Sequence, residues 1–131
     1  MKLTIGILED DLVSQFATRY CIEQSGHECE IIIYDDARMA LENFSSNNPR
    51  ERIMPDILFV DLIMPMMGGW EFLDRLEKIK GQANDMEIYV LSAFINSKDR
   101  IRARQHAMIK GFFDKPLSRY SIDKILDSRK S

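Results

Sequence analysis

Acidic, basic and hydroxyl side chains follow four short apolar runs of the sequence. These residues are Glu9, Asp10, Asp61, Ser92 and Lys115, with Asp11 beside the first pair. In an open parallel α/β sheet, the carboxyl ends of the strands border the crevice that binds ligands, so we expect these side chains to converge there. Three carboxylates, a hydroxyl group and an ammonium group together indicate a site for a hard cation and an anion, most simply Mg²⁺ and a phosphoryl group.

The elements expected to position these residues alternate between strands and helices. Buried apolar runs predict strands at residues 3–8, 30–34, 56–60, 86–91 and 109–113. Apolar residues at i, i+3, i+4 and i+7 predict the first helix, on the pattern Val13, Phe16, Ala17 and Tyr20. Later helices are expected at 37–44, 68–79 and 97–107, and after a cap at Ser118. Five strands in strict alternation with five helices predict an α/β fold with a doubly wound parallel sheet and right-handed crossovers.

Length and composition are those of one folded domain. The chain has 131 residues, 45% hydrophobic and 30% charged, and its net charge of -3 does not favour binding to nucleic acid or to an anionic membrane. No apolar run approaches the roughly 20 residues needed to span a bilayer. No signal-peptide pattern follows Met1, and Cys21 and Cys29 are too far apart for a CxxC motif, so we expect a cytoplasmic protein with reduced thiols.

Four motifs together resemble the signature of response regulator receiver domains, the CheY-like family of two-component signalling. They are Ile7 to Asp11, Val60 to Gly69, Leu91 to Ala93 and Asp114 to Pro116, each at the end of a predicted strand. The resemblance covers essentially the whole chain. It implies a flavodoxin-like (βα)5 fold with strand order 2-1-3-4-5 and a single receiver domain over residues 1–131.

The resemblance also assigns a phosphoacceptor and a metal site. Asp61 is implied to take a phosphoryl group from a sensor histidine kinase or a histidine phosphotransfer protein. A carboxylate is a weak nucleophile, and a divalent cation helps it by neutralising the charge between it and the phosphoryl group. Mg²⁺, with Mn²⁺ as a substitute, is implied to be bound directly by Asp10, Asp61 and the backbone carbonyl of Ile63, and through water by Glu9.

Phosphoryl acceptance and loss are implied to be catalysed by the domain itself, as a switch and not as the turnover of an enzyme. Lys115 is implied to act as a point charge on the phosphoryl oxygens, and Ser92 to donate a hydrogen bond to them. Phe112 occupies the position of the family's switch aromatic, so the resemblance implies that its ring can move inward when Ser92 shifts toward the phosphoryl group. A downstream protein target is expected to contact the surface formed by the fourth helix, fifth strand and last helix.

Two positions depart from the commonest pattern of this family. Many relatives carry polar side chains two residues beyond the acceptor and two residues beyond the serine, where this chain has Ile63 and Phe94. These positions flank the path of the water that hydrolyses the acyl phosphate. We therefore expect a phosphorylated state that is long-lived for the family.

Other functions fit parts of the pattern. A flavodoxin-type nucleotide or flavin module needs a phosphate loop rich in Gly, Ser or Thr after the first strand, where this chain has Glu9, Asp10 and Asp11. A phosphatase of the haloacid dehalogenase type needs a second Asp where this chain has Ile63. Asp11 is expected to serve only as the cap of the first helix.

A basic segment could bind nucleic acid, but a solvated helix face that selects an acidic protein partner is the better interpretation. It contains Lys98, Arg100, Arg102, Arg104 and Lys110. His27 and His106 have no ligand-spaced partners in the sequence, so neither is predicted to bind a metal. The chain ends soon after the last helix, so we expect a stand-alone receiver, with a receiver cut from a longer regulator as the alternative.

Overall fold

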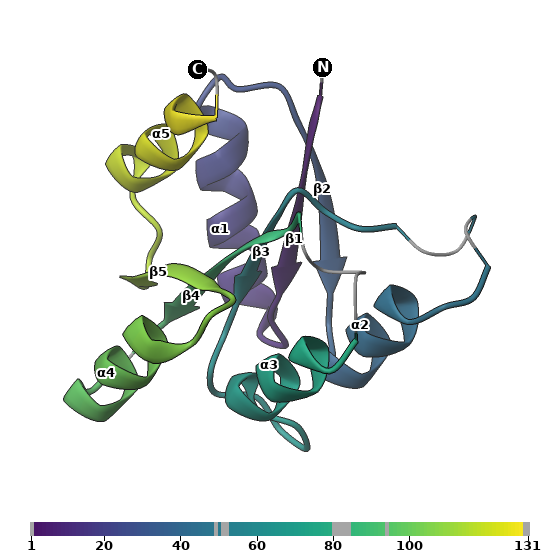
Figure 1. Cartoon of the computed structure of the whole chain (residues 1–131). Helices are drawn as coiled ribbons and strands as arrows, with labels where there is room; N and C mark the ends of the chain where they lie inside the picture. Colours follow the sequence, from purple (N-terminus) through teal and green to yellow (C-terminus); the bar gives the residue numbers. More distant parts are fainter. Residues whose placement is uncertain (1, 49, 51–52, 80–84, 94, 130–131) are drawn as a thin grey trace.

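Five parallel strands form one sheet in the computed structural model, which describes residues 2–48, 50, 53–79, 85–93 and 95–129 (Figure 1). The strands are β1 (Leu3–Leu8), β2 (Cys29–Tyr34), β3 (Ile57–Val60), β4 (Glu87–Ser92) and β5 (Ile109–Asp114). They lie in the order β2-β1-β3-β4-β5, and every neighbouring pair is parallel. This confirms the predicted flavodoxin-like α/β fold, with the more polar β5 at one edge of the sheet.

In the part of the chain that the structure describes, a helix follows each of the five strands, and the helices cover both faces of the sheet (Figure 1). They are α1 (Leu12–Gln24), α2 (Ala37–Phe44), α3 (Gly69–Glu77), α4 (Ser97–Gln105) and α5 (Arg119–Ser128). Four of them begin at a residue whose side chain accepts a hydrogen bond from a first-turn N–H group: Asp11, Asp36, Asn96 and Ser118. Among the described residues, no helix combines the length and the apolar character that a membrane crossing requires.

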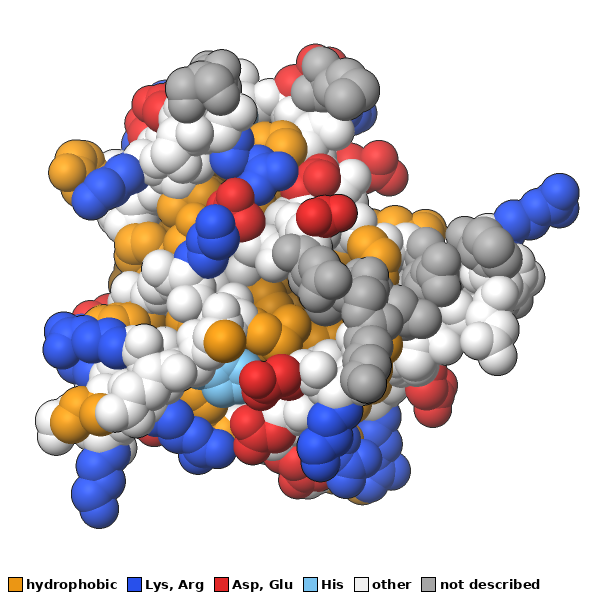
Figure 2. All heavy atoms as spheres, viewed as in Figure 1, with side chains coloured by type: hydrophobic (Ala, Val, Ile, Leu, Met, Phe, Trp, Pro, Cys, Tyr) orange, Lys and Arg blue, Asp and Glu red, His pale blue; other side chains and the backbone are white. Residues whose placement is uncertain are grey.

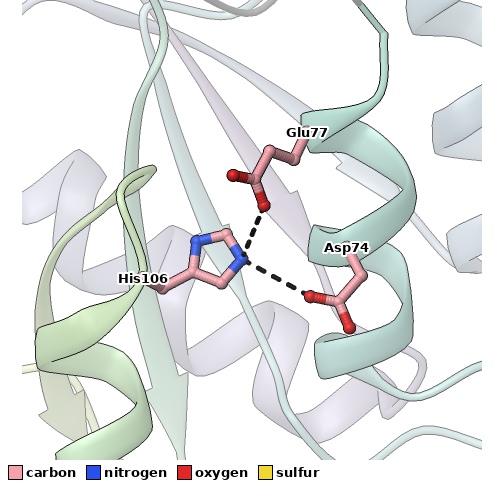
Figure 3. Close-up of side chains that lie close together, drawn as sticks. All are labelled: Asp74, Glu77 and His106. Atoms are coloured by element: carbon pink, nitrogen blue, oxygen red, sulfur yellow. Dashed lines mark ion pairs between the residues drawn. The ribbon is translucent and has the colours of Figure 1, made fainter.

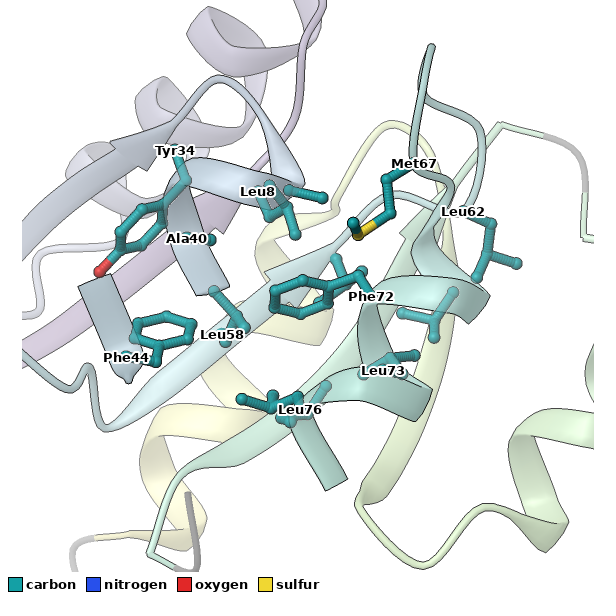
Figure 4. Close-up of a cluster of buried hydrophobic side chains, with 14 of the residues drawn as sticks. Leu8, Tyr34, Ala40, Phe44, Leu58, Leu62, Met67, Phe72, Leu73 and Leu76 are labelled. Atoms are coloured by element: carbon teal, nitrogen blue, oxygen red, sulfur yellow. The ribbon is translucent and has the colours of Figure 1, made fainter. Parts of the chain in front are cut away.

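Two apolar clusters form the core, one on each face of the sheet. The larger one packs α2 and α3 against the strands and is centred on aromatic and leucine side chains (Figure 4). It includes Phe44, Leu58, Phe72, Leu73 and Leu76, all of which are fully buried. The second cluster packs α1 and α5 against the opposite face through Ile22, Ile122 and Leu126. Burial on both faces is what gives the central strands their nearly continuous apolar runs.

Several elements differ from their predicted bounds by one or two residues. α4 ends at Gln105, two residues before the predicted end, because the backbone of His106 is extended, with φ -80° and ψ 122°. α3 ends at Glu77 and not at Ile79, since Lys78 is the C-cap. These differences matter for α4, because they place His106 in the turn that leads into β5.

The apolar pattern that predicts α1 does not face the core. Val13, Phe16 and Tyr20 are 76%, 68% and 54% exposed, and Phe16 stacks on Tyr20 with ring centroids 6.0 Å apart. The buried positions of this helix are instead Gln15, Thr18 and Ile22. The interior position of Gln15 is possible because its amide nitrogen Nε2 donates to the Glu9 carbonyl oxygen at 2.6 Å and to the Asp35 carboxylate at 2.8 Å.

Candidate functional site

The predicted site residues meet at the carboxyl-end edge of the sheet. Glu9 and Asp10 follow β1, Asp61 follows β3, Ser92 ends β4 and Lys115 follows β5. The register of the parallel strands brings these ends to the same level, with Leu8 opposite Val60 and Ser92 opposite Asp114. The convergence expected from the sequence is therefore present.

Asp61 is the centre of the site. It is 6% exposed, and its carboxylate is contacted by a residue that ends β4 and by one that follows β5. Ser92 Oγ donates to Oδ1 at 3.1 Å, and Lys115 Nζ lies 3.2 Å from Oδ2. The backbone N–H of Ile63 donates to Oδ1 at 3.3 Å. One hydroxyl group, one ammonium group and one amide thus hold this carboxylate in a fixed orientation.

Glu9 is the most deeply buried carboxyl group of the site, at 3% exposure. It forms an ion pair with Lys115 and accepts a hydrogen bond from the backbone N–H of Asp11 at 3.2 Å. Burial raises the pKa of Glu9 to about 7, and the adjacent Asp61 acts in the same direction, whereas the hydrogen bond from Lys115 opposes the shift. Three carboxyl groups, those of Glu9, Asp10 and Asp61, therefore lie together with one ammonium group, which cannot neutralise all of their charge.

Lys115 is held as a cation by these carboxylates. Burial alone would lower its pKa, but the hydrogen bond to Glu9 and the charge of Asp61 outweigh burial and raise the pKa. Its backbone N–H donates to the Ser92 carbonyl oxygen at 3.0 Å, and its peptide bond to Pro116 is cis. The ammonium group of Lys115 is therefore charged and is held between the carboxylates of Glu9 and Asp61.

The acidic side chains can bind a divalent cation. Glu9, Asp10 and Asp61 each offer a carboxylate oxygen, and these oxygens lie within 4.8 Å of one another. Two of the side chains are buried while Asp10 is exposed, so the cluster opens to solvent on one side. Hard oxygen ligands with room for water fit Mg²⁺ or Mn²⁺. A cation at this position would offset the charge of Asp61, which adds to the effect of burial on the pKa of Glu9.

A close backbone contact fixes the loop after Asp61. The N–H of Gly69, at the start of α3, donates to the Leu62 carbonyl oxygen at 3.0 Å. A Cβ atom on Gly69 would lie 2.5 Å from the Asp61 carbonyl oxygen, so only glycine allows α3 to begin this close to the end of β3. Met66, in the same loop, has a φ of 69°. The loop after Asp61, which we call the acceptor loop after the role expected for Asp61, is thus shaped by the packing of α3 against it.

The switch residue expected from the sequence lies beneath two arginines. The guanidinium groups of Arg100 and Arg104 lie 5.0 Å and 5.8 Å from the centroid of the Phe112 ring. Ile63, whose N–H contacts Asp61, is 65% exposed, and Phe94 lies outside the described residues. Sequence reasoning missed Gln15, whose amide nitrogen donates to the Glu9 carbonyl oxygen. A single polar residue in a helix does not by itself indicate a buried contact.

The chain belongs to the response regulator receiver domain family, whose model matches residues 5–127. It is a receiver domain of two-component signalling, which is a signalling domain and not a conventional enzyme. Members of this family interact with histidine kinases or phosphotransfer proteins and with downstream targets. This membership agrees with the resemblance drawn from the four motifs and disfavours the flavin-module and phosphatase alternatives.

Solved structures of response regulators are similar over nearly the whole chain. A two-component response regulator from Legionella pneumophila is 28% identical with a TM-score of 0.84, and 98% of each chain is covered. One from Cytophaga hutchinsonii is 20% identical with a TM-score of 0.83, covering 98% of this chain and 97% of that one. The Mn²⁺-bound form of response regulator Rcp1 is 18% identical with a TM-score of 0.75, covering 98% and 92%. No curated protein matches the chain.

Proposed function

We propose that this protein accepts a phosphoryl group on Asp61 and signals through the change that follows. The observation that carries the proposal is the environment of the Asp61 carboxylate. Ser92 Oγ and Lys115 Nζ lie within 3.2 Å of its two oxygens, and the carboxylates of Glu9 and Asp10 lie beside it. A nucleophile, a fixed cation, a hydroxyl donor and a cation-binding cluster are the parts that phosphoryl transfer needs.

The reaction forms one bond and breaks another. An Asp61 oxygen attacks the phosphorus atom of the donor, and the bond from phosphorus to the histidine nitrogen of the donor breaks as the acyl phosphate forms. Ser92 Oγ and Lys115 Nζ then hydrogen-bond to phosphoryl oxygens, to which they are already close through their contacts with Asp61. Because both groups are held in place beforehand, little reorganisation is needed in the transition state.

A divalent cation is the second requirement of this proposal. Asp10, Asp61 and the backbone carbonyl of Ile63 are proposed as direct ligands, with Glu9 acting through water. When bound, Mg²⁺ or Mn²⁺ supplies charge neutralisation between the attacking carboxylate and the phosphoryl oxygens. The acidic cluster supports this role, and so does the Mn²⁺-bound structure of the related regulator Rcp1.

The donor protein must approach the edge that carries Asp61, and the first turns of α1 lie next to that edge. Leu12 and Val13 directly follow the acidic residues of the site, and Phe16 continues the same exposed apolar surface. Monomeric proteins rarely expose several large apolar side chains side by side without a partner. We therefore assign this surface to the docking of the kinase or phosphotransfer protein.

The output surface is proposed to be the α4-β5-α5 face. Phe112 lies on β5 under Arg100 and Arg104 of α4, so inward movement of its ring would break two cation–π contacts. Arg100 also pairs with Asp114, and Arg102 pairs with Asp74. Pairing of these arginines with acidic side chains favours a protein partner over nucleic acid for this face. Self-catalysed loss of the phosphoryl group would reset it.

The decisive experiment is intact-protein mass spectrometry after incubation with acetyl phosphate. We expect wild-type protein to gain one phosphoryl group with Mg²⁺ or Mn²⁺ present and none when the cations are chelated. Asp61→Asn should abolish the gain, whereas Asp56→Asn, which changes a carboxylate before β3, should retain it. A mass gain in the Asp61 variant equal to that of wild type would overturn the proposal.

A further inference from the structure

A second cluster of possible metal ligands lies away from the phosphoacceptor residues, between α3 and the turn after α4. Asp74 and Glu77 occupy neighbouring positions on α3, and the imidazole of His106 points toward both (Figure 3). The space-filling view shows an imidazole at the surface on this side of the molecule, bordered by acidic side chains (Figure 2). One ligand atom from each of the three residues lies within 4.8 Å of the other two.

His106 carries the strongest sign that the cluster has a ligand. Its side chain is only 9% exposed, and among the described residues its Nε2 atom has no hydrogen-bond partner. The distances from Nε2 to Asp74 Oδ1 and Glu77 Oε2 are 3.6 Å and 3.7 Å, which are too long for hydrogen bonds. Nε2 thus meets the two carboxylates only at long ion-pair distances. A buried polar atom that makes no hydrogen bond costs free energy, and a group bound between the three side chains would compensate it.

The separations fit the ligand atoms of one metal ion. Ligands about 2.1 Å from a tetrahedral Zn²⁺ ion lie about 3.4 Å from each other. The two observed separations from Nε2 exceed this value by only a few tenths of an ångström. The side chains of Asp74 and Glu77 are about half exposed, at 52% and 54%, which leaves the remaining coordination positions open to water.

A neighbouring arginine orients one of the three ligands, Asp74. Arg102 Nη2 binds Asp74 Oδ2 at 3.3 Å, which leaves Oδ1 directed at His106. Arg102 also lies over the ring of Trp70, whose centroid is 6.4 Å from that of His106. His106 Nδ1 accepts a long hydrogen bond of 3.3 Å from the N–H of Met108. A metal at Nε2 would place the imidazole proton on Nδ1, so binding gives up this one weak contact.

We propose that Asp74, Glu77 and His106 bind a divalent transition-metal ion, with Zn²⁺ as the best fit. An imidazole nitrogen with two carboxylate oxygens suits Zn²⁺ better than Mg²⁺ or Ca²⁺, which take oxygen ligands. The ion would tie α3, which begins at the acceptor loop, to the segment between α4 and β5. The site was not predicted, because His106 has no ligand-spaced partner in the sequence and meets Asp74 and Glu77 only in the folded chain.

Zn²⁺ titration in excess Mg²⁺ tests the proposal, since Mg²⁺ competes at the acidic phosphoacceptor cluster. Calorimetry gives the affinity, and the fluorescence of Trp70, the only tryptophan, reports binding near His106. We expect one Zn²⁺ per chain in wild type. His106→Gln and Asp74→Asn should each weaken binding by more than about tenfold, since even outer-shell partners of a metal are worth that much.

The matched control is His27→Gln. His27 is the only other histidine and also faces carboxylates, with Nε2 3.3 Å from Asp123 Oδ1. This variant and Asp61→Asn should bind Zn²⁺ as wild type does, which separates the proposed site from the phosphoacceptor function. Circular dichroism verifies that each variant is folded. Failure of folded wild type to bind Zn²⁺, or unchanged binding in folded His106→Gln and Asp74→Asn, would overturn the proposal.

Discussion

Lys115 Nζ lies 3.2 Å from Asp61 Oδ2 and also pairs with Glu9, although Asp61 and Lys115 are 54 residues apart in the sequence. The same ammonium group thus neutralises the proposed nucleophile and the most buried acid of the site. A phosphoryl group would compete with these carboxylates for Lys115, and a divalent cation would compete with Lys115 for the carboxylates. Loss of Lys115 should therefore change both phosphorylation and cation binding.

Lys115→Ala should slow phosphorylation of Asp61 by small donors while strengthening Mg²⁺ binding. The slowing, by about 100-fold or more, follows from the loss of a fixed cation at the phosphoryl oxygens. The stronger Mg²⁺ binding follows because the ammonium group no longer neutralises Glu9 and Asp61. Mass spectrometry over time and a Mg²⁺ titration give the two quantities. Wild-type values for both in a folded variant would refute this role.

The metal-free protein should lose stability as the pH rises through the range in which Glu9 ionises. The pKa of Glu9 is about 7 in the folded protein, against a reference value of 4.5. The folded state therefore binds more protons than the unfolded state between these values, so the free energy of unfolding falls as the pH rises. The stabilisation is complete below the lower value and lost above the upper one.

Urea unfolding in the presence of a chelator, at a series of pH values, measures this effect. Glu9→Gln carries no titrating group at this position, so its free energy of unfolding should vary less with pH than that of wild type over the same interval. An equally steep fall in the Gln variant would show that Glu9 is not the cause.

The fold and the convergence of the site residues could be predicted from the sequence, because each depends on a regular pattern along the chain. Apolar runs and their alternation with helical spacing define the sheet, and residues that follow parallel strands meet at one edge. Asp61, Ser92 and Lys115 are brought together by this rule alone. The order of the strands came from the family resemblance, since alternation does not fix which strand lies at the centre.

Two features of the structure were not predicted from the sequence, each for a physical reason. The apolar stripe of α1 has the spacing of a core-facing helix, but hydrogen bonds from Gln15 to Glu9 and Asp35 turn a polar position inward and leave Phe16 outside. The cluster around His106 depends on where α4 ends, and helix ends are the least certain feature of a periodic pattern. A cytoplasmic location and the limits of the domain stay predictions.

Removing the apolar surface of α1 should impair protein donors but not small ones. In the double variant Val13→Ser and Phe16→Ser, phosphotransfer from purified histidine phosphotransfer proteins should slow by about tenfold, equivalent to about 1.4 kcal/mol. Both side chains are exposed, so the fold should be retained. Acetyl phosphate should phosphorylate the variant at the wild-type rate. Ile101→Ser, an exposed apolar position on α4, serves as the control. Equal slowing with both donors would contradict docking.

Gly69→Ala should destabilise the protein by about 1–3 kcal/mol, the usual cost of overpacking. Its Cβ would lie 2.5 Å from the Asp61 carbonyl oxygen and 2.8 Å from Leu62 Cα, both backbone atoms that cannot turn away. Gly68→Ala is the matched control, because a Cβ atom at Gly68 would come no closer than 3.2 Å to another atom, the Leu62 carbonyl oxygen. Urea denaturation should rank wild type above Gly68→Ala and Gly68→Ala above Gly69→Ala. The reverse order for the variants would exclude the proposed contact.

Ile63→Asn should shorten the lifetime of the phosphorylated protein. The Ile63 side chain is exposed beside the acceptor, and its N–H donates to Asp61 Oδ1 at 3.3 Å, so the side chain borders the approach to the phosphoryl group. Hydrolysis needs a water molecule in line with the oxygen–phosphorus bond, and an apolar side chain offers that water no hydrogen bond. An amide should hold it and speed decay by up to about tenfold, or about 1.4 kcal/mol of barrier.

Loss of the phosphoryl group after removal of the donor, followed by mass spectrometry, measures this rate. Met66→Asn is the control, because Met66 is exposed in the same loop and its φ of 69° is one that Asn tolerates. We expect the control to decay as wild type does, since the new amide is not next to the acceptor in the chain. If Ile63→Asn decays no faster than the control, the apolar side chain does not protect the acyl phosphate, and the long lifetime expected from the sequence has no basis at this position.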